Sequence, residues 1–119
     1  YATNSASKAL VRIDVTTGPT SQPGSARTVQ ALPGHPAELV EHDDELLVAL
    51  PDVRAIARIP KANLGTLTAI RAITLRDGTP NDLALSPDGT RMVTCGTESK
   101  RVRILSLAAA PCVRCQSRR

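Results

Sequence analysis

Aromatic side chains are almost missing from this 119-residue chain. Phe and Trp are absent, and Tyr1 is the single aromatic residue. Any core must therefore be built from Val, Ile, Leu and Ala, which bury less area than aromatic rings. The platforms that usually stack nucleic-acid bases or surround quaternary ammonium groups are missing as well. We therefore expect neither nucleic acid nor a quaternary ammonium compound as the ligand.

Long apolar runs are missing too. No stretch approaches the ~18 apolar residues that a membrane span requires, so we expect no transmembrane segment. The chain begins at Tyr1 without Met and without the basic and apolar pattern of a signal peptide. We interpret this start as the cut end of a longer chain.

The net charge of +4 is unevenly distributed. Residues 33–52 carry six acidic residues and neither Lys nor Arg, whereas residues 91–119 carry seven Lys or Arg and one acid, Glu98. The pattern predicts an acidic edge and a basic C-terminal third. The basic third either binds an anionic partner or is a solvated surface, and both interpretations stay open.

A tight turn is predicted at residues 86–89, which read Ser-Pro-Asp-Gly. Proline suits the second position of a type I turn and glycine its fourth. Apolar residues recur at every second position on both sides of this turn: Leu83 and Leu85 before it, and Val93 and Cys95 after it. This period of two predicts a β-hairpin with one side buried. Cys95 is then interpreted as a core thiol.

The same arrangement occurs one repeat earlier, with His42-Asp43-Asp44-Glu45 in the place of the turn at 86–89. A strand with Arg between two apolar residues recurs at spacings of 46 and 45 residues: Val11-Arg12-Ile13, Ala57-Arg58-Ile59 and Val102-Arg103-Ile104. Candidates for a further strand lie at 26–32 and 66–75. Four short strands in each unit of about 45 residues are typical of a β-propeller blade.

We therefore expect an all-β fold of β-propeller blades, each with four antiparallel strands. The chain would hold about two and a half blades of an incomplete propeller over residues 1–107, divided into 1–32, 36–76 and 80–107. Residues 108–119 would form a basic, Cys-containing C-terminal tail. Because propellers close with roughly four to eight blades, the partners would be the remaining blades of the same propeller or further copies of the chain.

The first residues resemble a known repeat. Tyr1-Ala2-Thr3-Asn4 and the later strand Val11-Arg12-Ile13-Asp14 resemble the YVTN repeat of β-propeller proteins, and the likeness covers roughly residues 1–107. Gly34-His35 is similar to the Gly-His of WD repeats, but no Trp-Asp pair follows. YVTN-like propellers include lactonases, exported binding proteins and domains joined to haem proteins. The resemblance therefore implies a fold and favours a periplasmic or extracellular location, but it leaves the function open.

One stretch suggests a metal site. Residues 79–89, from Thr79-Pro80-Asn81 to the tight turn, are similar to a stretch of the gluconolactonase family, in which the Asn helps to hold a divalent metal that polarises a lactone carbonyl. The resemblance implies this role for Asn81, although Asp82 stands where the family has Gly. Glu38 and Asp82 are repeat-equivalent acids that suit calcium or magnesium, and zinc is a further candidate. Alternatively, all three are ordinary residues at the starts of strands.

The tail contains Cys112-Val113-Arg114-Cys115, half of a zinc site. It lacks the His of a haem-attachment sequence, since Gln116 follows. A tail that forms a disulfide is the alternative.

The sequence thus predicts a binding or scaffold surface for a protein or a small molecule, without catalysis by this chain alone. Two alternatives stay open. One is part of a metal-dependent sugar lactonase, based on Asn81, Glu38 and Asp82. The other is a sensor or docking domain of a redox protein, based on Cys112 and Cys115.

Overall fold

The computed structural model describes residues 1–13, 26–66, 70–76, 78–96, 98 and 100–107. Within these ranges the fold is all-β, as predicted, and its helical elements are two short 3-10 turns, η1 (Pro51–Val53) and η2 (Lys61–Asn63). No helix in the described part of the chain is long and apolar enough to cross a membrane.

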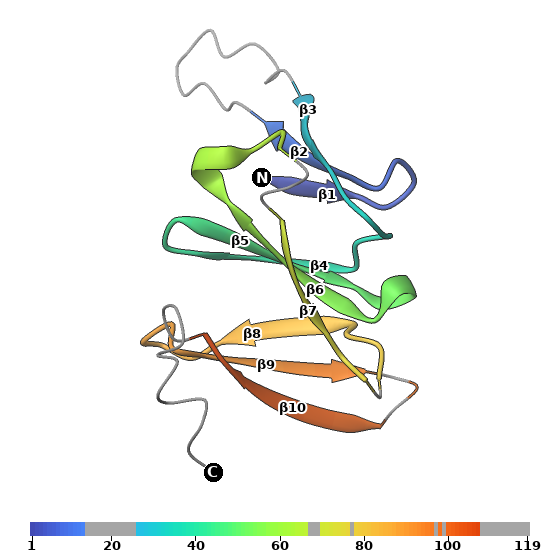
Figure 1. The fold of residues 1–119 in the computed structure, drawn as a ribbon, viewed down its shortest axis with the longest axis vertical. Coiled ribbons are helices and arrows are strands. Elements are labelled where there is room, and N and C mark those ends of the chain that lie inside the picture. Colours follow the sequence, from blue (N-terminus) through green and yellow to red (C-terminus); the bar gives the residue numbers. More distant parts are fainter. Residues whose placement is uncertain (14–25, 67–69, 77, 97, 99, 108–119) are drawn as a thin grey trace, which may run out of the picture.

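The strands form three antiparallel sheets that are stacked one above another (Figure 1). The first sheet contains β1 (Ala2–Asn4), β2 (Ala9–Ile13) and β3 (Ala26–Ala31). The middle sheet contains β4 (Glu38–His42), β5 (Glu45–Leu50), β6 (Ala55–Pro60) and β7 (Arg71–Thr74). The third sheet contains β8 (Asp82–Leu85), β9 (Arg91–Gly96) and β10 (Arg101–Ser106). In each sheet the strands are neighbours in sequence order, and each pairs antiparallel with the next.

Both predicted hairpins are present. The turn at 86–89 joins β8 to β9, and the acidic turn joins β4 to β5. The interpretation of Cys95 as a core thiol is wrong, because its side chain is exposed whereas Met92 and Thr94 are buried. Cys95 lies on the outer face of the third sheet, which neither of the other two described sheets covers.

One backbone conformation recurs in all three sheets. Lys8, Arg54 and Lys100 each have a left-handed backbone, with φ of 49°, 53° and 49°, and each precedes the strand β2, β6 or β10. These residues are 46 positions apart in both intervals. Left-handed φ is uncommon outside glycine, so its recurrence at one position marks equivalent turns.

The third copy of the apolar-Arg-apolar pattern is shifted by one residue in the structure. Ile56 is opposite Ala49 in the middle sheet, and Val102 is opposite Cys95 in the third. Val102 is therefore equivalent to Ile56. The 45-residue spacing in the sequence had indicated that Val102 is equivalent to Ala57. A shift of one residue in a strand moves each side chain to the other face of its sheet.

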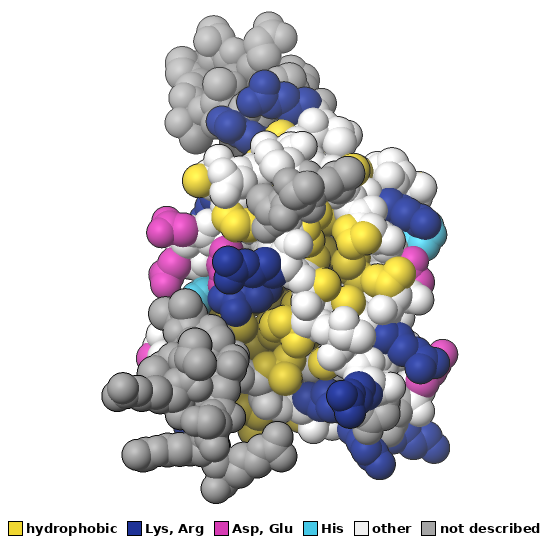
Figure 2. Space-filling model, in the orientation of Figure 1, with side chains coloured by type: hydrophobic (Ala, Val, Ile, Leu, Met, Phe, Trp, Pro, Cys, Tyr) yellow, Lys and Arg dark blue, Asp and Glu magenta, His cyan; other side chains and the backbone are white. Residues whose placement is uncertain are grey.

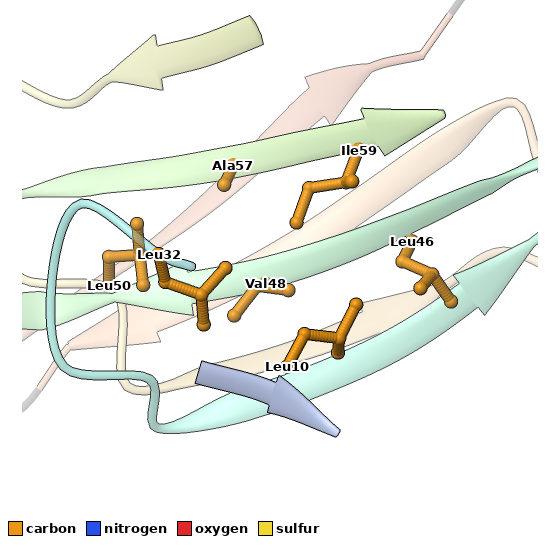
Figure 3. Close-up of a cluster of buried hydrophobic side chains, with 7 residues drawn as sticks. All are labelled: Leu10, Leu32, Leu46, Val48, Leu50, Ala57 and Ile59. Atoms are coloured by element: carbon orange, nitrogen blue, oxygen red, sulfur yellow. The ribbon is translucent and has the colours of Figure 1, made fainter. Parts of the chain in front are cut away.

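The middle sheet is buried on both faces. All five residues of Leu46–Leu50 in β5 are 0% exposed, which is typical of an apolar run in a strand that is covered on both sides. Two hydrophobic clusters result. The first fills the space between the first and middle sheets and contains Leu10, Leu32, Leu46, Val48, Leu50, Ala57 and Ile59 (Figure 3). The second fills the space between the middle and third sheets and contains Leu47, Ala49, Ile56, Leu75, Leu83, Met92 and Leu107.

Hydrophobic side chains lie across the middle of the surface in Figure 2. Lys and Arg side chains are spread over several parts of this view, and one group lies at its lower right, where Figure 1 places the third sheet. Within the predicted basic third, Arg91, Lys100 and Arg101 in or beside this sheet are exposed, whereas residues 108–119 lie outside the described residues.

Candidate functional site

A cleft of about 470 Å³ lies between the turn that joins β4 to β5 and the turn that joins β8 to β9. We name it the turn cleft. Residues 42–45 and 88–90 provide two of its walls, and Arg58, Pro60 and Leu107 complete it. The cleft thus brings together two repeat-equivalent turns from neighbouring sheets, which are far apart in the sequence.

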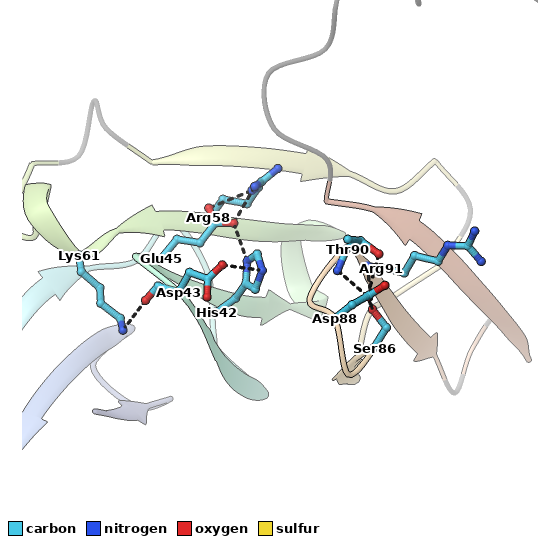
Figure 4. Close-up of polar contacts among 9 residues, drawn as sticks. All are labelled: His42, Asp43, Glu45, Arg58, Lys61, Ser86, Asp88, Thr90 and Arg91. Atoms are coloured by element: carbon cyan, nitrogen blue, oxygen red, sulfur yellow. Dashed lines mark hydrogen bonds and ion pairs between the residues drawn. The ribbon is translucent and has the colours of Figure 1, made fainter.

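An ion pair holds one wall of the turn cleft. Arg58 on β6 donates from Nη2 to Glu45 Oε1 at 2.6 Å and from Nε to Glu45 Oε2 at 3.1 Å (Figure 4). The two side chains are only 25% and 19% exposed, so solvent screens this bidentate pair less than a surface pair. Burial raises the pKa of Glu45, but the hydrogen bonds from Arg58 and His42 more than offset it, so the pKa lies below its ordinary value.

The opposite wall is fixed by Asp88. Its Oδ1 accepts hydrogen bonds from the Ser86 hydroxyl at 2.6 Å, the Thr90 hydroxyl at 2.8 Å and the Thr90 backbone N–H at 3.0 Å. These donors, first of all the Ser86 hydroxyl, lower the pKa of Asp88 to about 2. Asp88 therefore remains an anion over the whole physiological range while it holds the turn closed.

His42 lies between the two walls. Its Nδ1 is 3.4 Å from Glu45 Oε1, and its Nε2 is 3.5 Å from Asp43 Oδ2. On its other side the ring faces Gly89, where a Cβ atom would lie only 2.6 Å from His42 Nε2. The imidazole therefore joins the turn of the middle sheet to the turn of the third sheet.

The turn cleft has an excess of negative charge. Among the described residues, four carboxylates line it, those of Asp43, Asp44, Glu45 and Asp88, against the guanidinium of Arg58. Pro60 and Leu107 add apolar surface. A concave site of this composition favours a ligand with a positive charge and a short apolar part.

The residues predicted to hold a metal lie elsewhere, at the starts of β4 and β8. Glu38 Oε1 accepts from the backbone N–H of Leu39 at 3.3 Å, and Asp82 Oδ1 accepts from the backbone N–H of Leu83 at 2.9 Å. The two acids are equivalent in the ladders, since each is paired with the same position of the next strand, Ala49 or Cys95.

Asn81 immediately precedes β8. Its Oδ1 accepts from the Thr79 hydroxyl at 3.3 Å, and its backbone N–H donates to the carbonyl of Cys95. Within the part of the chain that the structure describes, no group of three or more His, Cys, Asp or Glu side chains is arranged to hold a metal ion. The metal role of Asn81, Glu38 and Asp82 stays a prediction.

Cys112 and Cys115 lie outside the described residues. His35 joins two sheets, since its Nδ1 is 2.7 Å from the Ser5 carbonyl oxygen, while its backbone N–H donates to both carboxylate oxygens of Asp52. This arrangement fixes the connection that enters β4.

Sequence reasoning missed the turn cleft. The acidic turn was recognised as a turn, but its proximity to Gly89 and Leu107 depends on how two sheets pack. The pair of Glu45 and Arg58 had a partial signal in the sequence, because Glu45 ends the predicted turn at 42–45 and Arg58 lies on the predicted strand at 57–59 of the same unit. Comparison of the chain with protein-family models, with curated proteins and with solved structures finds no match in any of the three.

Proposed function

We propose that this chain is a segment of a propeller-type repeat protein that acts as a binding scaffold and uses the turn cleft to bind a small cationic group. The three sheets would be blade parts within residues 1–32, 36–76 and 80–107, about two and a half blades of an incomplete propeller. The tail at 108–119 would lie outside these blades. The resemblance to YVTN repeats supports an exported, periplasmic or extracellular protein.

The regular repeat supports the scaffold. Equivalent left-handed turns recur every 46 residues, and the middle sheet is covered on both faces by sheets of the same repeat. Stacked repeats of this kind bury a continuous core only through their neighbours. The turns between their strands are then left at the edges, where they are accessible to ligands.

The observation that carries the binding proposal is the charge of the turn cleft. Arg58 neutralises the negative charge of Glu45. Asp43, Asp44 and Asp88 add negative charge that no Lys or Arg of the described lining offsets. The Asp43 side chain is 87% exposed, so a ligand can contact its carboxylate without any movement of neighbouring side chains. The geometry fits an amine or a guanidinium on a short aliphatic chain, either free or at the end of a protein side chain.

Titration calorimetry with agmatine, a guanidinium and an amine on a four-carbon chain, tests this proposal. We expect saturable binding that weakens as the salt concentration rises, because exposed charges are screened. Asp43→Asn combined with Asp44→Asn removes two charges from the cleft and should weaken binding about tenfold or more, since pairs of charges at such sites contribute about 1 kcal/mol each.

Glu98→Gln is the matched control, because Glu98 is an exposed acid outside the cleft lining. It should leave agmatine binding unchanged. Absence of binding to the wild-type chain, or an equal loss in Glu98→Gln and in the double variant, would contradict the proposal.

The lactonase alternative is favoured by one structural relationship. Glu38 and Asp82 begin β4 and β8, and these two strands contact each other between neighbouring sheets. Part of a metal-dependent sugar lactonase would then use Asn81 with these acids. Calorimetry with calcium, magnesium and zinc chlorides tests it: metal binding that Asn81→Ala abolishes would support the alternative, and binding unaffected by Asn81→Ala would exclude it.

The redox alternative depends on Cys112 and Cys115, outside the described residues.

A further inference from the structure

The outer face of the third sheet carries apolar side chains that are open to solvent. Val102 is 69% exposed, Ile104 is 67% exposed and Val93 is 37% exposed. Cys95 is exposed beside them. These four residues lie on one face, because Val102 is opposite Cys95 and Ile104 is opposite Val93 in the ladder of β9 and β10. We name this surface the β9–β10 face.

The register shows what the equivalent surface does in the middle sheet. Leu47 and Ala49 of β5 occupy the ladder positions of Val93 and Cys95, and Ile56 of β6 occupies that of Val102. Leu47, Ala49 and Ile56 are all 0% exposed. They belong to the second hydrophobic cluster, where the third sheet covers them.

The first sheet repeats this relationship. Leu10 stands two residues after Lys8, as Ile56 stands two residues after Arg54, and Leu10 is covered by the middle sheet in the first cluster. The same face of the first and middle sheets is therefore covered by the next sheet of the repeat. By this register the β9–β10 face is a surface for a further sheet of the same kind.

The complementary surface is on the same chain, at its opposite end. The outer face of the first sheet carries Ala2, Val11 and Ile13, which occupy the positions of Val48, Ala57 and Ile59. Val48, Ala57 and Ile59 are the residues with which the middle sheet receives the first sheet. Ile13 is 45% exposed, so this surface is open as well. We name it the β1–β2 face.

We propose that the β9–β10 face binds the β1–β2 face of a second copy of this chain, with the sheet packing that already joins the three sheets within one copy. The inference rests on the proposed repeat scaffold and names its partner. A head-to-tail contact between two different faces builds a closed ring or an open chain of copies, depending on the rotation between neighbours.

Sedimentation velocity of the full chain tests the contact over a range of concentrations from about 1 to 300 μM, because transient interfaces commonly have dissociation constants in this range. We expect concentration-dependent association. Val102→Glu with Ile104→Glu places two charges on the β9–β10 face and should raise the dissociation constant about tenfold or more, since apolar centres of interfaces tolerate charge poorly. Ala37→Glu with Thr74→Glu adds the same charge at exposed positions outside both faces and should leave association unchanged.

A mixing experiment distinguishes this geometry from others. Val11→Glu with Ile13→Glu blocks the β1–β2 face, so each blocked variant alone should stay monomeric. Because each retains the face that the other lacks, an equimolar mixture should form a dimer, which unfolded variants would not do. Circular dichroism of each variant checks that the β-structure is retained.

Three outcomes would overturn the inference. These are a wild-type chain that stays monomeric throughout, a Val11→Glu and Ile13→Glu variant that still dimerises alone through two identical faces, or a mixture that does not associate. Agmatine binding by the monomeric variants is measured separately. A wild-type chain that stays monomeric but binds agmatine would overturn this inference and leave the proposed function in place.

Discussion

The imidazole of His42 occupies the space that a side chain at Gly89 would need. A Cβ atom at Gly89 would lie 2.6 Å from His42 Nε2 and 2.9 Å from His42 Cδ2, and both distances are shorter than van der Waals contact allows. Gly89 also has a left-handed φ of +71°. The turn at 86–89 therefore requires glycine for its left-handed backbone, and the contact between the two turns requires that position 89 has no side chain.

Gly89→Ala should lower the free energy of unfolding by about 1–2 kcal/mol, because it introduces backbone strain and displaces His42. Urea denaturation measures the change. The same substitution in a His42→Ala background should cost less, since only the strain remains. An equal cost in both backgrounds would show that the ring and the turn do not interact.

Thr94→Val should raise the free energy of unfolding by about 1 kcal/mol. Among the described residues, the buried Thr94 hydroxyl has no hydrogen-bond partner. Thr94 occupies the ladder position of Val48, which is fully buried in the middle sheet. Valine keeps the shape and removes the unsatisfied hydroxyl. Thermal denaturation measures the effect, and a lower Tm than that of the wild type would reveal a partner for this hydroxyl.

Arg54→Gly should stabilise the chain slightly, by up to about 1 kcal/mol. Its left-handed φ of 53° is unfavourable for a residue with a Cβ, and the gain exceeds the entropy that glycine adds to the unfolded chain. Arg76→Gly is the control, because Arg76 is exposed and does not have a positive φ, so this change should be neutral or destabilising. Urea denaturation that ranks Arg76→Gly as the more stable variant would contradict the expectation.

Asp88→Asn should lower the Tm at pH 7, and the difference from the wild type should decrease in acid. The pKa of Asp88 is lowered from 3.8 to about 2, so its carboxylate stabilises the folded chain at every pH above about 4. This contribution is lost progressively as the pH falls through 2, where the folded wild type is also protonated. Circular dichroism melts between pH 7 and pH 2 check the convergence, and a constant difference in Tm would contradict it.

The sequence predicted the positions of the strands better than it predicted which face of each strand is buried. Alternation of apolar residues and the turn at 86–89 were sufficient for the hairpins, because both are local properties. The core position of Cys95 was wrong since the pattern tells which side of a strand is apolar, not whether a neighbouring sheet covers it. Val102 and Ile56 occupy the same ladder position, yet within the described residues a sheet covers Ile56 and none covers Val102.

The candidate site shows the same limit. The acidic residues of the turn at 42–45 were visible in the sequence, but the turn cleft also needs Gly89 and Leu107 from another unit. Contacts between sheets depend on their stacking, which a local pattern does not encode. One distant relationship was accessible, the equivalence of Glu38 and Asp82, because a repeat places equivalent residues at equivalent points of the fold.

Arg58→Met should raise the pKa of Glu45 and destabilise the chain at neutral pH. Methionine replaces the aliphatic part of Arg58 with an apolar chain but removes both hydrogen bonds to Glu45, whose side chain is 19% exposed. After allowance for screening by solvent, we expect a loss of about 1–2 kcal/mol at pH 7. Because the pKa of Glu45 in the wild type lies below its ordinary value of 4.5, this stabilisation is present above that pH and is lost as the pH falls through the lowered pKa. Urea denaturation from pH 7 to pH 3 should therefore show the two proteins converging in acid, while Arg76→Met, which alters an exposed cation outside the cleft lining, should follow the wild type at every pH. If Arg58→Met kept its full deficit at pH 3, the loss would come from the packing of the side chain and not from its charge.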